Sequence, residues 1–393
     1  MKKKDKTYHV KNFYDGDKKL EKVVLEVKNG FIYKISRKGY LSSQAFDIVV
    51  PTFVDLQVYG SNQRLLSEYP SIKTLEKMDS FHKKNGTYFF QPTIASYPYE
   101  VIYKSLEAIK NYMNQNPESG CIGLHVEGPW FNPNKKGAHI IDYIHRPSEK
   151  VINEIIEKSK GTISMITLAP EVIKVELMKK LINGGIILSA GHSDCDYKLA
   201  NKLLGKIIHT STHLFNAMPS LHHRELNLTS AILLNQNVYS SIIADGYHVD
   251  FDVIRMAHKL KKDKLFCITD AVTETNKGPY KHKNSGLFYS NNGKLSGSNI
   301  TMPKSFKNLI EKVGLSVQES IDMCSNIPIE VIKGVSSQIK LKKGNFARFN
   351  ISDSLIYIND GQIILDGKVR IEIIDSNEIY KYLLTPKNYR KNF

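Results

Sequence analysis

Eight apolar, β-rich runs alternate with helix-like segments through the middle of the chain. Between most runs, apolar residues recur at the three-to-four spacing of an amphipathic helix, as at Leu177, Met178 and Leu181. Such alternation over roughly 280 residues predicts an α/β fold, a (β/α)8 pseudo-TIM barrel. For the alternative, a doubly wound sheet, we would expect a glycine-rich phosphate loop after an early strand, and the sequence has no such motif. The predicted strands cover residues 47–57, 87–95, 121–127, 162–169, 186–192, 207–213, 238–245 and 264–270.

The two ends of the chain show a different pattern, in which short strands are separated by turns. Near the N-terminus, Asn29-Gly30 is a hairpin signal between two apolar runs. The C-terminal part repeats this style. We therefore predict a small β-sandwich domain formed by residues 1–50 and 336–393, beside a catalytic barrel at 51–335.

Several predicted strands end in a side chain that can bind a metal ion or transfer a proton. These ends carry Glu127, His192, His213 and Asp270. The C-terminal ends of barrel strands meet at one face, so the four side chains would lie together. Two imidazoles and a carboxylate suit a divalent ion with an open coordination position. A single histidine at a strand end is more often a packing residue, but the joint arrangement suggests a metal-dependent hydrolase.

Composition narrows the class of protein. No apolar run of about 18 residues exists, and the basic N-terminus lacks the apolar core of a signal peptide, so we expect no membrane span. The four cysteines are far apart and favour a reduced, cytoplasmic protein. With 55 Lys and Arg against 39 Asp and Glu, the net charge is +16. Because the lysines are spread along the chain, we interpret this charge as compositional bias or as attraction for an anionic small substrate, not as a nucleic-acid site.

Seven short motifs follow one another between residues 47 and 335 and carry a family resemblance. As a set, they are similar to the N-acetylglucosamine-6-phosphate deacetylases of the amidohydrolase superfamily. The resemblance implies a pseudo-TIM barrel with a flanking β-sandwich, a homodimer, and hydrolysis of the N-acetyl group of an amino-sugar 6-phosphate. The motifs are HVEGPW at 125–130, KKGAH at 135–139, AGHS at 190–193, THLFNAM at 212–218, IADGYH at 243–248, TDA at 269–271 and LSGS at 295–298.

The resemblance also implies roles for individual residues. It makes Glu127, His192 and His213 the ligands of one divalent metal ion per subunit, with zinc first and iron, manganese or cobalt as alternatives. Asp270 would act as the general base and then as the general acid. The residues that would contact the sugar phosphate, with His139 nearest to the scissile amide, are Ala138, His139, Asn216, Ala217, Arg224, His248, Leu295, Ser296 and Gly297.

Two positions depart from the superfamily pattern and leave alternatives open. Where the first-strand signature is D-x-H-x-H-G, Gln57 and Tyr59 replace both histidines, which removes ligands for a second metal ion. The same chemistry could act on N-acetylgalactosamine 6-phosphate. A non-catalytic sugar-phosphate-binding relative could also have lost these histidines, although the retained Asp270 argues against it. Nucleic-acid binding rests on charge alone and would be salt-sensitive.

Overall fold

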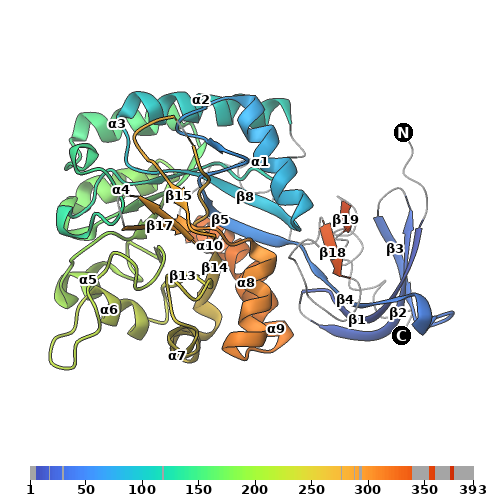
Figure 1. Cartoon of the computed structure of the whole chain (residues 1–393). Coiled ribbons are helices and arrows are strands. Elements are labelled where there is room, and N and C mark those ends of the chain that lie inside the picture. Colours follow the sequence, from blue (N-terminus) through green and yellow to red (C-terminus); the bar gives the residue numbers. More distant parts are fainter. Residues whose placement is uncertain are drawn as a thin grey trace.

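The centre of the computed structural model is a barrel of eight parallel strands (Figure 1). The strands follow chain order around the sheet, and a bridge between Val58 and Ala271 connects the two edge strands. The (β/α)8 prediction is therefore confirmed. The barrel strands are β5 (Phe53–Val58), β8 (Thr87–Ile94), β9 (Leu124–Glu127), β10 (Ile163–Leu168), β11 (Ile187–Ala190), β12 (Thr210–Ser211), β13 (Tyr239–Ile243) and β14 (Leu265–Ile268). The structure describes residues 6–16, 18–28, 31–116, 119–275, 277–286, 288–291, 294–338, 354–358 and 372–375.

The structure corrects the first predicted strand, residues 47–57. Two strands occupy this stretch, because β4 (Ala45–Pro51) belongs to a second sheet and only β5 enters the barrel. Thr52 separates them, and its hydroxyl donates to the carbonyl oxygen of Gly86 at 2.9 Å. Both strands are apolar and follow each other almost directly, so their pattern reads as one run.

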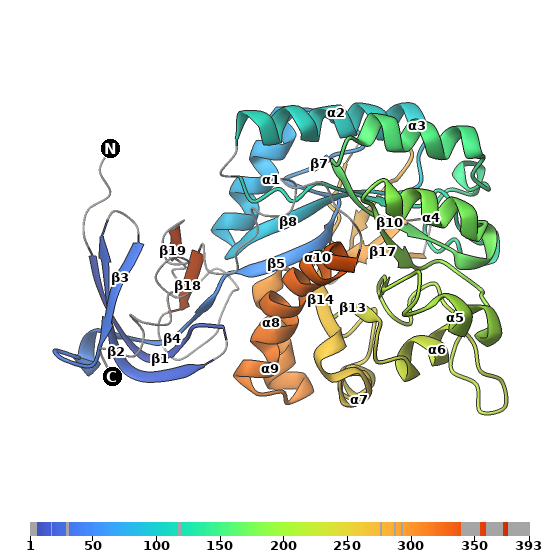
Figure 2. The same cartoon turned by 180° about the vertical axis from the view of Figure 1, so that it is seen from behind.

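Helices cover the outside of the barrel (Figures 1 and 2), and several begin at a residue that caps the first turn. Ser71, Ser148 and Asp250 accept hydrogen bonds from backbone amides at the starts of α1, α3 and α7. No described helix combines the length and apolar character that a membrane crossing requires. The helices are α1 (Ile72–Lys84), α2 (Tyr99–Gln115), α3 (Glu149–Ser159), α4 (Val175–Asn183), α5 (Tyr197–Leu203), α6 (Leu228–Leu234), α7 (Phe251–Lys261), α8 (Met302–Asn308), α9 (Val317–Ile321) and α10 (Ile327–Gln338).

Strands from both ends of the chain form the second sheet, beside the barrel (Figure 1). Its strand order is β19-β18-β4-β1-β2-β3, and its core includes Val10, Leu25 and Val49. The sandwich arrangement and the domain limits also involve residues 339–353, 359–371 and 376–393. Those residues lie outside the described part, so both stay predictions. The remaining strands of this sheet are β1 (Lys6–Tyr14), β2 (Lys19–Lys28), β3 (Phe31–Ser36), β18 (Ser354–Ile358) and β19 (Glu372–Asp375).

The barrel interior changes from apolar to polar along its axis. Ile329 of α10 shares a hydrophobic cluster with Phe266, the second residue of β14. Figure 2 shows α10 beside β5 and β14. Further along, the hydroxyl oxygens of Thr167 and Thr212 lie 2.7 Å apart, and His125 Nε2 lies 2.7 Å from that of Thr167. The hydrogen bonds among these polar side chains stiffen the end of the barrel at which the strands end.

Two small antiparallel sheets follow barrel strands at the strand-end face. One is the hairpin of β6 (Gly60–Ser61) and β7 (Arg64–Leu65). The other contains β15 (Lys283–Asn284), β16 (Phe288–Asn291) and β17 (Lys294–Ser298). Leu65, Val272 and Tyr289 pack the two sheets together, so the segment that follows β14 is held from both sides.

Candidate functional site

The side chains singled out at strand ends share an unusual backbone setting. Glu127 is the last residue of β9, whereas His192, His213 and Asp270 each follow their strand by two residues. The last three have positive φ values of 49°, 35° and 53°. Non-glycine residues rarely adopt this left-handed conformation, and it concentrates at functional sites. Strained backbone conformation thus coincides with three of the four predicted residues.

All four side chains line one cavity of about 150 Å³. Of the residues predicted to contact the substrate, Arg224 alone does not line this cavity; it lies on an exposed loop. The structure thus brings together residues from motifs spread over much of the chain. The predicted substrate contacts that do line the cavity are Ala138, His139, Asn216, Ala217, His248, Leu295, Ser296 and Gly297.

Three donor atoms in this cavity have the spacing of a metal site. Glu127 Oε1 lies 3.0 Å from His213 Nε2 and 3.5 Å from His192 Nε2, and the two histidine nitrogens are 3.1 Å apart. Tetrahedral ligands about 2.1 Å from a zinc ion lie about 3.4 Å from one another. The donor types and their separations therefore fit a divalent ion.

A second set of donors, Glu127, His139 and His192, also lies within 4.8 Å. Hydrogen bonds at the other ring nitrogen separate the two histidines of this set. The backbone N–H of Ser96 donates to His139 Nδ1 at 3.1 Å, so the proton of the neutral ring sits on Nε2. The carbonyl oxygen of Lys135 lies 2.9 Å from His192 Nδ1 and accepts its proton, which leaves the Nε2 lone pair free. His192 is thus suited to bind a metal ion, and His139 to donate a hydrogen bond.

The pKa values of the two carboxylic acids of the cavity are shifted in opposite directions. Burial first, and the nearby Glu127 charge second, raise the pKa of Asp270 to about 6. Burial also opposes ionisation of Glu127, but its contacts with the surrounding histidines, that with His139 first, outweigh burial and hold the Glu127 pKa well below its usual value. The charged Glu127 carboxylate is therefore suited to bind a metal ion. The Asp270 carboxyl group, which titrates near neutral pH, is suited to carry a proton.

His248 is oriented by its neighbour Asp245. The Asp245 carboxylate lies 2.6 Å from His248 Nδ1 and also accepts the backbone N–H of His248 at 2.8 Å. Burial opposes this charge, yet the hydrogen bonds from His248 lower the Asp245 pKa. With Nδ1 occupied, Nε2 is the nitrogen that His248 can offer to a ligand in the cavity.

Sequence reasoning missed some residues that line the cavity. The hydroxyl of Tyr280 donates a hydrogen bond to the carbonyl oxygen of Ser96. Ser96 in turn contacts His139 Nδ1 and holds that ring in place. His282 Nδ1 lies 2.9 Å from the hydroxyl of Ser296, and burial lowers the His282 pKa to about 4, so the ring is neutral. Both precede β15, outside the strand-end pattern. The signal that could have found them is the polar and aromatic character of the segment between Asp270 and β15.

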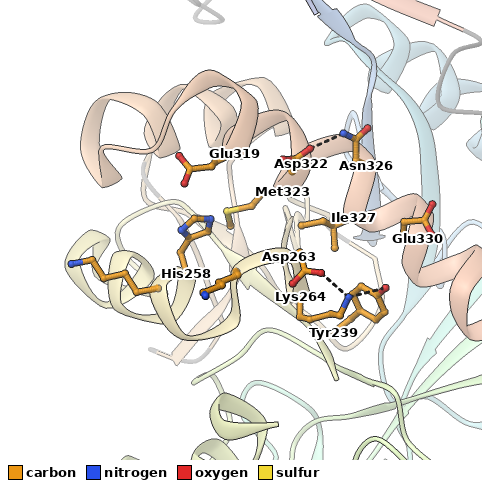
Figure 3. A pocket seen from close by; sticks show the side chains of 12 residues that line it. Tyr239, His258, Asp263, Lys264, Glu319, Asp322, Met323, Asn326, Ile327 and Glu330 are labelled. Carbon is orange, nitrogen blue, oxygen red and sulfur yellow. Dashed lines mark hydrogen bonds and ion pairs between the residues drawn. The ribbon is translucent and has the colours of Figure 1, made fainter. Parts of the chain in front are cut away.

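A larger cavity, of about 690 Å³, lies at the opposite end of the barrel, where β13 and β14 begin (Figure 3). None of the described residues that line it belongs to the predicted site. Several of its charged groups have local partners: Lys264 Nζ lies 2.9 Å from Asp263, and Asp322 accepts a hydrogen bond from Asn326 Nδ2 at 2.7 Å. Size alone does not make this cavity a candidate active site.

The comparison with protein families agrees with this geometry. A model of the amidohydrolase family matches residues 48–370. The match spans all eight barrel strands and every residue of the predicted site. It therefore concerns the whole barrel and not one motif.

Individual relatives are similar over most of their length. An N-acetylglucosamine-6-phosphate deacetylase of Haemophilus influenzae is 30% identical over 76% of this chain and 81% of its own. An N-acetylgalactosamine-6-phosphate deacetylase of Shewanella is 28% identical, over 81% of this chain and 80% of its own. The crystal structure of N-acetylglucosamine-6-phosphate deacetylase from Pasteurella multocida has a TM-score of 0.78 and 29% identity, covering 90% of this chain and 96% of its own.

Proposed function

Because this chain belongs to the amidohydrolase family, we propose that it is a metal-dependent hydrolase that converts N-acetyl-D-glucosamine 6-phosphate to D-glucosamine 6-phosphate and acetate. This reaction is a step of amino-sugar catabolism. The names of the relatives supply the substrate class. The cavity supplies the residues: two histidines and a glutamate with metal-ligand spacing, and a separate carboxyl group of raised pKa.

The proton steps of this hydrolysis fall to Asp270. When bound by Glu127, His192 and His213, a divalent ion supplies the Lewis acidity that activates water for attack. The Asp270 carboxylate accepts the proton of that water as the new C–O bond forms at the amide carbonyl. It then returns the proton to the amine nitrogen as the C–N bond breaks. One carboxylate serves both steps because the transfers are sequential.

His139 stabilises the negative charge that develops on the amide oxygen. Its Nε2 proton, assigned from the Ser96 contact to Nδ1, points to the Glu127 carboxylate in the cavity, with Nε2 3.2 Å from Glu127 Oε2. A donor held in place before the reaction costs no reorganisation in the transition state. The other residues of the cavity that we propose to contact the sugar phosphate are Ala138, Asn216, Ala217, His248, Leu295, Ser296 and Gly297.

The proposal also covers the metal ion, the oligomeric state and the location of the protein. We propose one divalent ion per subunit, with zinc first and iron, manganese or cobalt as alternatives. Arg224 is exposed and does not line the cavity of the same chain. This position supports a homodimer in which Arg224 reaches the phosphate bound by the other subunit. The free, buried state of Cys121, Cys195, Cys267 and Cys324 supports a cytoplasmic location.

The observation that carries the proposal is Asp270 beside the metal-ligand set. A protein that only bound a sugar phosphate would not need a buried carboxyl group with a pKa near 6 at this place. The non-catalytic alternative is thereby disfavoured. The galactosamine epimer stays a second candidate, because relatives of both names match this chain.

An acetate-release assay on metal-defined enzyme tests the proposal. Full-length protein is stripped with a chelator, reloaded with one equivalent of Zn²⁺, Mn²⁺, Co²⁺ or Fe²⁺, and given each 6-phosphorylated N-acetylhexosamine in turn. We expect acetate from the glucosamine substrate only after metal is restored, with no gain from a second equivalent. A higher kcat/KM on the galactosamine substrate would favour the epimer. Absence of acetate from both substrates at full metal occupancy would contradict the function.

A further inference from the structure

Gln57 and Tyr59 have no part in the mechanism above, yet both contact its carboxylates. Gln57 Nε2 lies 2.9 Å from Glu127 Oε1 and 2.6 Å from Asp270 Oδ1. It also lies 3.1 Å from the hydroxyl oxygen of Tyr59. That hydroxyl donates to the other oxygen of Glu127, Oε2. One amide and one phenol thus connect both acidic groups of the site.

We propose that Gln57 and Tyr59 are positioning residues that form a hydrogen-bonded clamp: they fix the Glu127 carboxylate for metal binding and leave one chosen oxygen of Asp270 for proton transfer. The Asp270 half of this proposal rests on the proposed function. The Glu127 half concerns metal binding alone, so the two halves can be tested separately.

The available protons match the available acceptors at Glu127. The Gln57 carboxamide has two N–H protons, one for Glu127 Oε1 and one for Asp270 Oδ1. A phenol with an ordinary pKa of about 10 keeps its proton at neutral pH, so Tyr59 donates to Oε2. Both oxygens of Glu127 therefore receive a hydrogen bond from the clamp. Outer hydrogen bonds of this kind orient a metal-ligating carboxylate and are worth about 10–100-fold in metal affinity or activity.

The clamp also distinguishes the two oxygens of Asp270. Oδ1 is the acceptor for Gln57. In the part of the chain that the structure describes, Asp270 Oδ2 has no hydrogen bond, while the residue lines the cavity. Oδ2 is therefore the oxygen that takes the proton of the attacking water and returns it to the amine.

Main-chain hydrogen bonds hold the clamp in place. The backbone N–H of Asp270 donates to the carbonyl oxygen of Gln57 at 3.0 Å, and that of Tyr59 donates to Ala271 at 2.9 Å. The end of β5 and the segment after β14 are thus locked together at the point where both side chains project. Gln57 is only 1% exposed. Groups carried on such rigid, buried elements hold their geometry better than groups on loops.

The first experiment measures metal affinity and needs no substrate. Zn²⁺ is titrated into metal-free, full-length protein against a chromophoric chelator. We expect the zinc Kd of Tyr59→Phe to rise about 10–100-fold, because Glu127 loses one orienting donor. Tyr239→Phe is the matched control, since among the residues that the structure describes its hydroxyl has a hydrogen bond with Lys264 alone, at 3.4 Å, at the opposite end of the barrel. Its zinc Kd should equal that of the wild type.

The second experiment measures turnover at saturating zinc. We expect Gln57→Leu to lower kcat about 10–100-fold with little change in KM, because Asp270 loses its orientation while the sugar contacts stay. Gln57→Asn, which keeps the amide on a shorter side chain, should recover part of kcat. Thermal melting of the metal-free variants should match that of Tyr239→Phe.

Two results would overturn the clamp. One is a wild-type zinc Kd in Tyr59→Phe together with a wild-type kcat in both Gln57 variants. The other is melting of the metal-free variants well below the control, which would show a structural role instead. If the wild type released no acetate while Tyr59→Phe still bound zinc more weakly, the Glu127 half would stand, and the proposed function and the Asp270 half would fall.

Discussion

The two ends of the barrel hold cavities of very different size, and the smaller one has the features of an active site. The cavity at the strand starts measures about 690 Å³, and the one at the strand ends about 150 Å³. At the strand ends, Glu127 is 1% exposed and Asp270 is 9% exposed, and Gln57 donates a hydrogen bond to each. At the strand starts, Lys264 and Asp263 pair with each other at the surface (Figure 3).

This difference teaches that convergence of buried ionisable groups, and not volume, identifies the site. Water screens charged groups at a surface, which weakens the effect of one on another. Buried groups that share acceptors and donors cannot all hold their ordinary charge, so their pKa values separate. The spread between Glu127 and Asp270 is an instance of this effect. We expect substitutions at the two ends to differ accordingly.

Asp270→Asn should give the largest effect. Asparagine keeps the shape of the side chain but cannot accept the proton of water, and a general base is worth roughly 10²–10⁴-fold in rate. We therefore expect kcat to fall by that factor while one equivalent of zinc stays bound, measured by acetate release and by metal analysis. Asp263→Asn is the matched control at the opposite end and should leave kcat unchanged. Near-full activity of Asp270→Asn, or loss of its metal, would contradict the assigned role.

Arg224→Ala tests whether the smaller cavity is complete in one chain. A guanidinium matches phosphate oxygens well, and a charge-assisted contact is worth roughly 1.5–3 kcal/mol. We expect KM for the phosphorylated substrate to rise about 10–100-fold, measured by steady-state kinetics. An unphosphorylated N-acetylhexosamine serves as the control substrate and should be affected little. An equal loss on both substrates would show that Arg224 supports the fold or the dimer instead.

The pH dependence of kcat/KM should report the raised pKa of Asp270. The catalytic form is the carboxylate, so activity is present above this pKa and is lost as pH falls through it. Burial and the Glu127 charge place the pKa at about 6, and a divalent ion beside the carboxylate moves it downward. We expect an acidic limb at or below about pH 6, with about a tenfold loss per pH unit beneath it. A limb at higher pH, or its persistence in Asp270→Asn, would assign it to another group.

Much of this site could be predicted from the sequence because strand ends carry their own signal. An apolar run that stops in Glu127 or His192 is enough to place that side chain at the barrel face where the strands end. The same logic led to Asp270. It failed at residues 47–57, where the apolar pattern continues through Thr52 although the chain passes from one sheet to another.

Other contacts could not be predicted, because they join residues that no local pattern relates. Gln57 lies on the first barrel strand and Asp270 lies two residues past the last one, so the two meet only when the barrel closes. From the sequence, Gln57 and Tyr59 could be described only as lost metal ligands, whereas the structure shows them as hydrogen-bond donors. His282 lines the cavity from the segment between β14 and β15, where strand periodicity predicts nothing.

The smallest effect on activity should come from a stability change at the strand-start end. Ser316 accepts a hydrogen bond from the backbone N–H of Glu319, and the Glu319 side chain accepts one from the N–H of Ser316, so the two residues form a capping box at the start of α9. Glu319 also lines the larger cavity. We expect Ser316→Ala to lower the free energy of unfolding by about 0.5–2 kcal/mol, measured by denaturant titration, because the helix start loses its cap. Its kcat/KM and zinc Kd should stay at wild-type values. In such barrels the strand-end face carries the active site, whereas the strand-start face contributes to stability. A loss of kcat/KM without a loss of stability would mean that the larger cavity takes part in the reaction, and the contrast between the two ends would have to be abandoned.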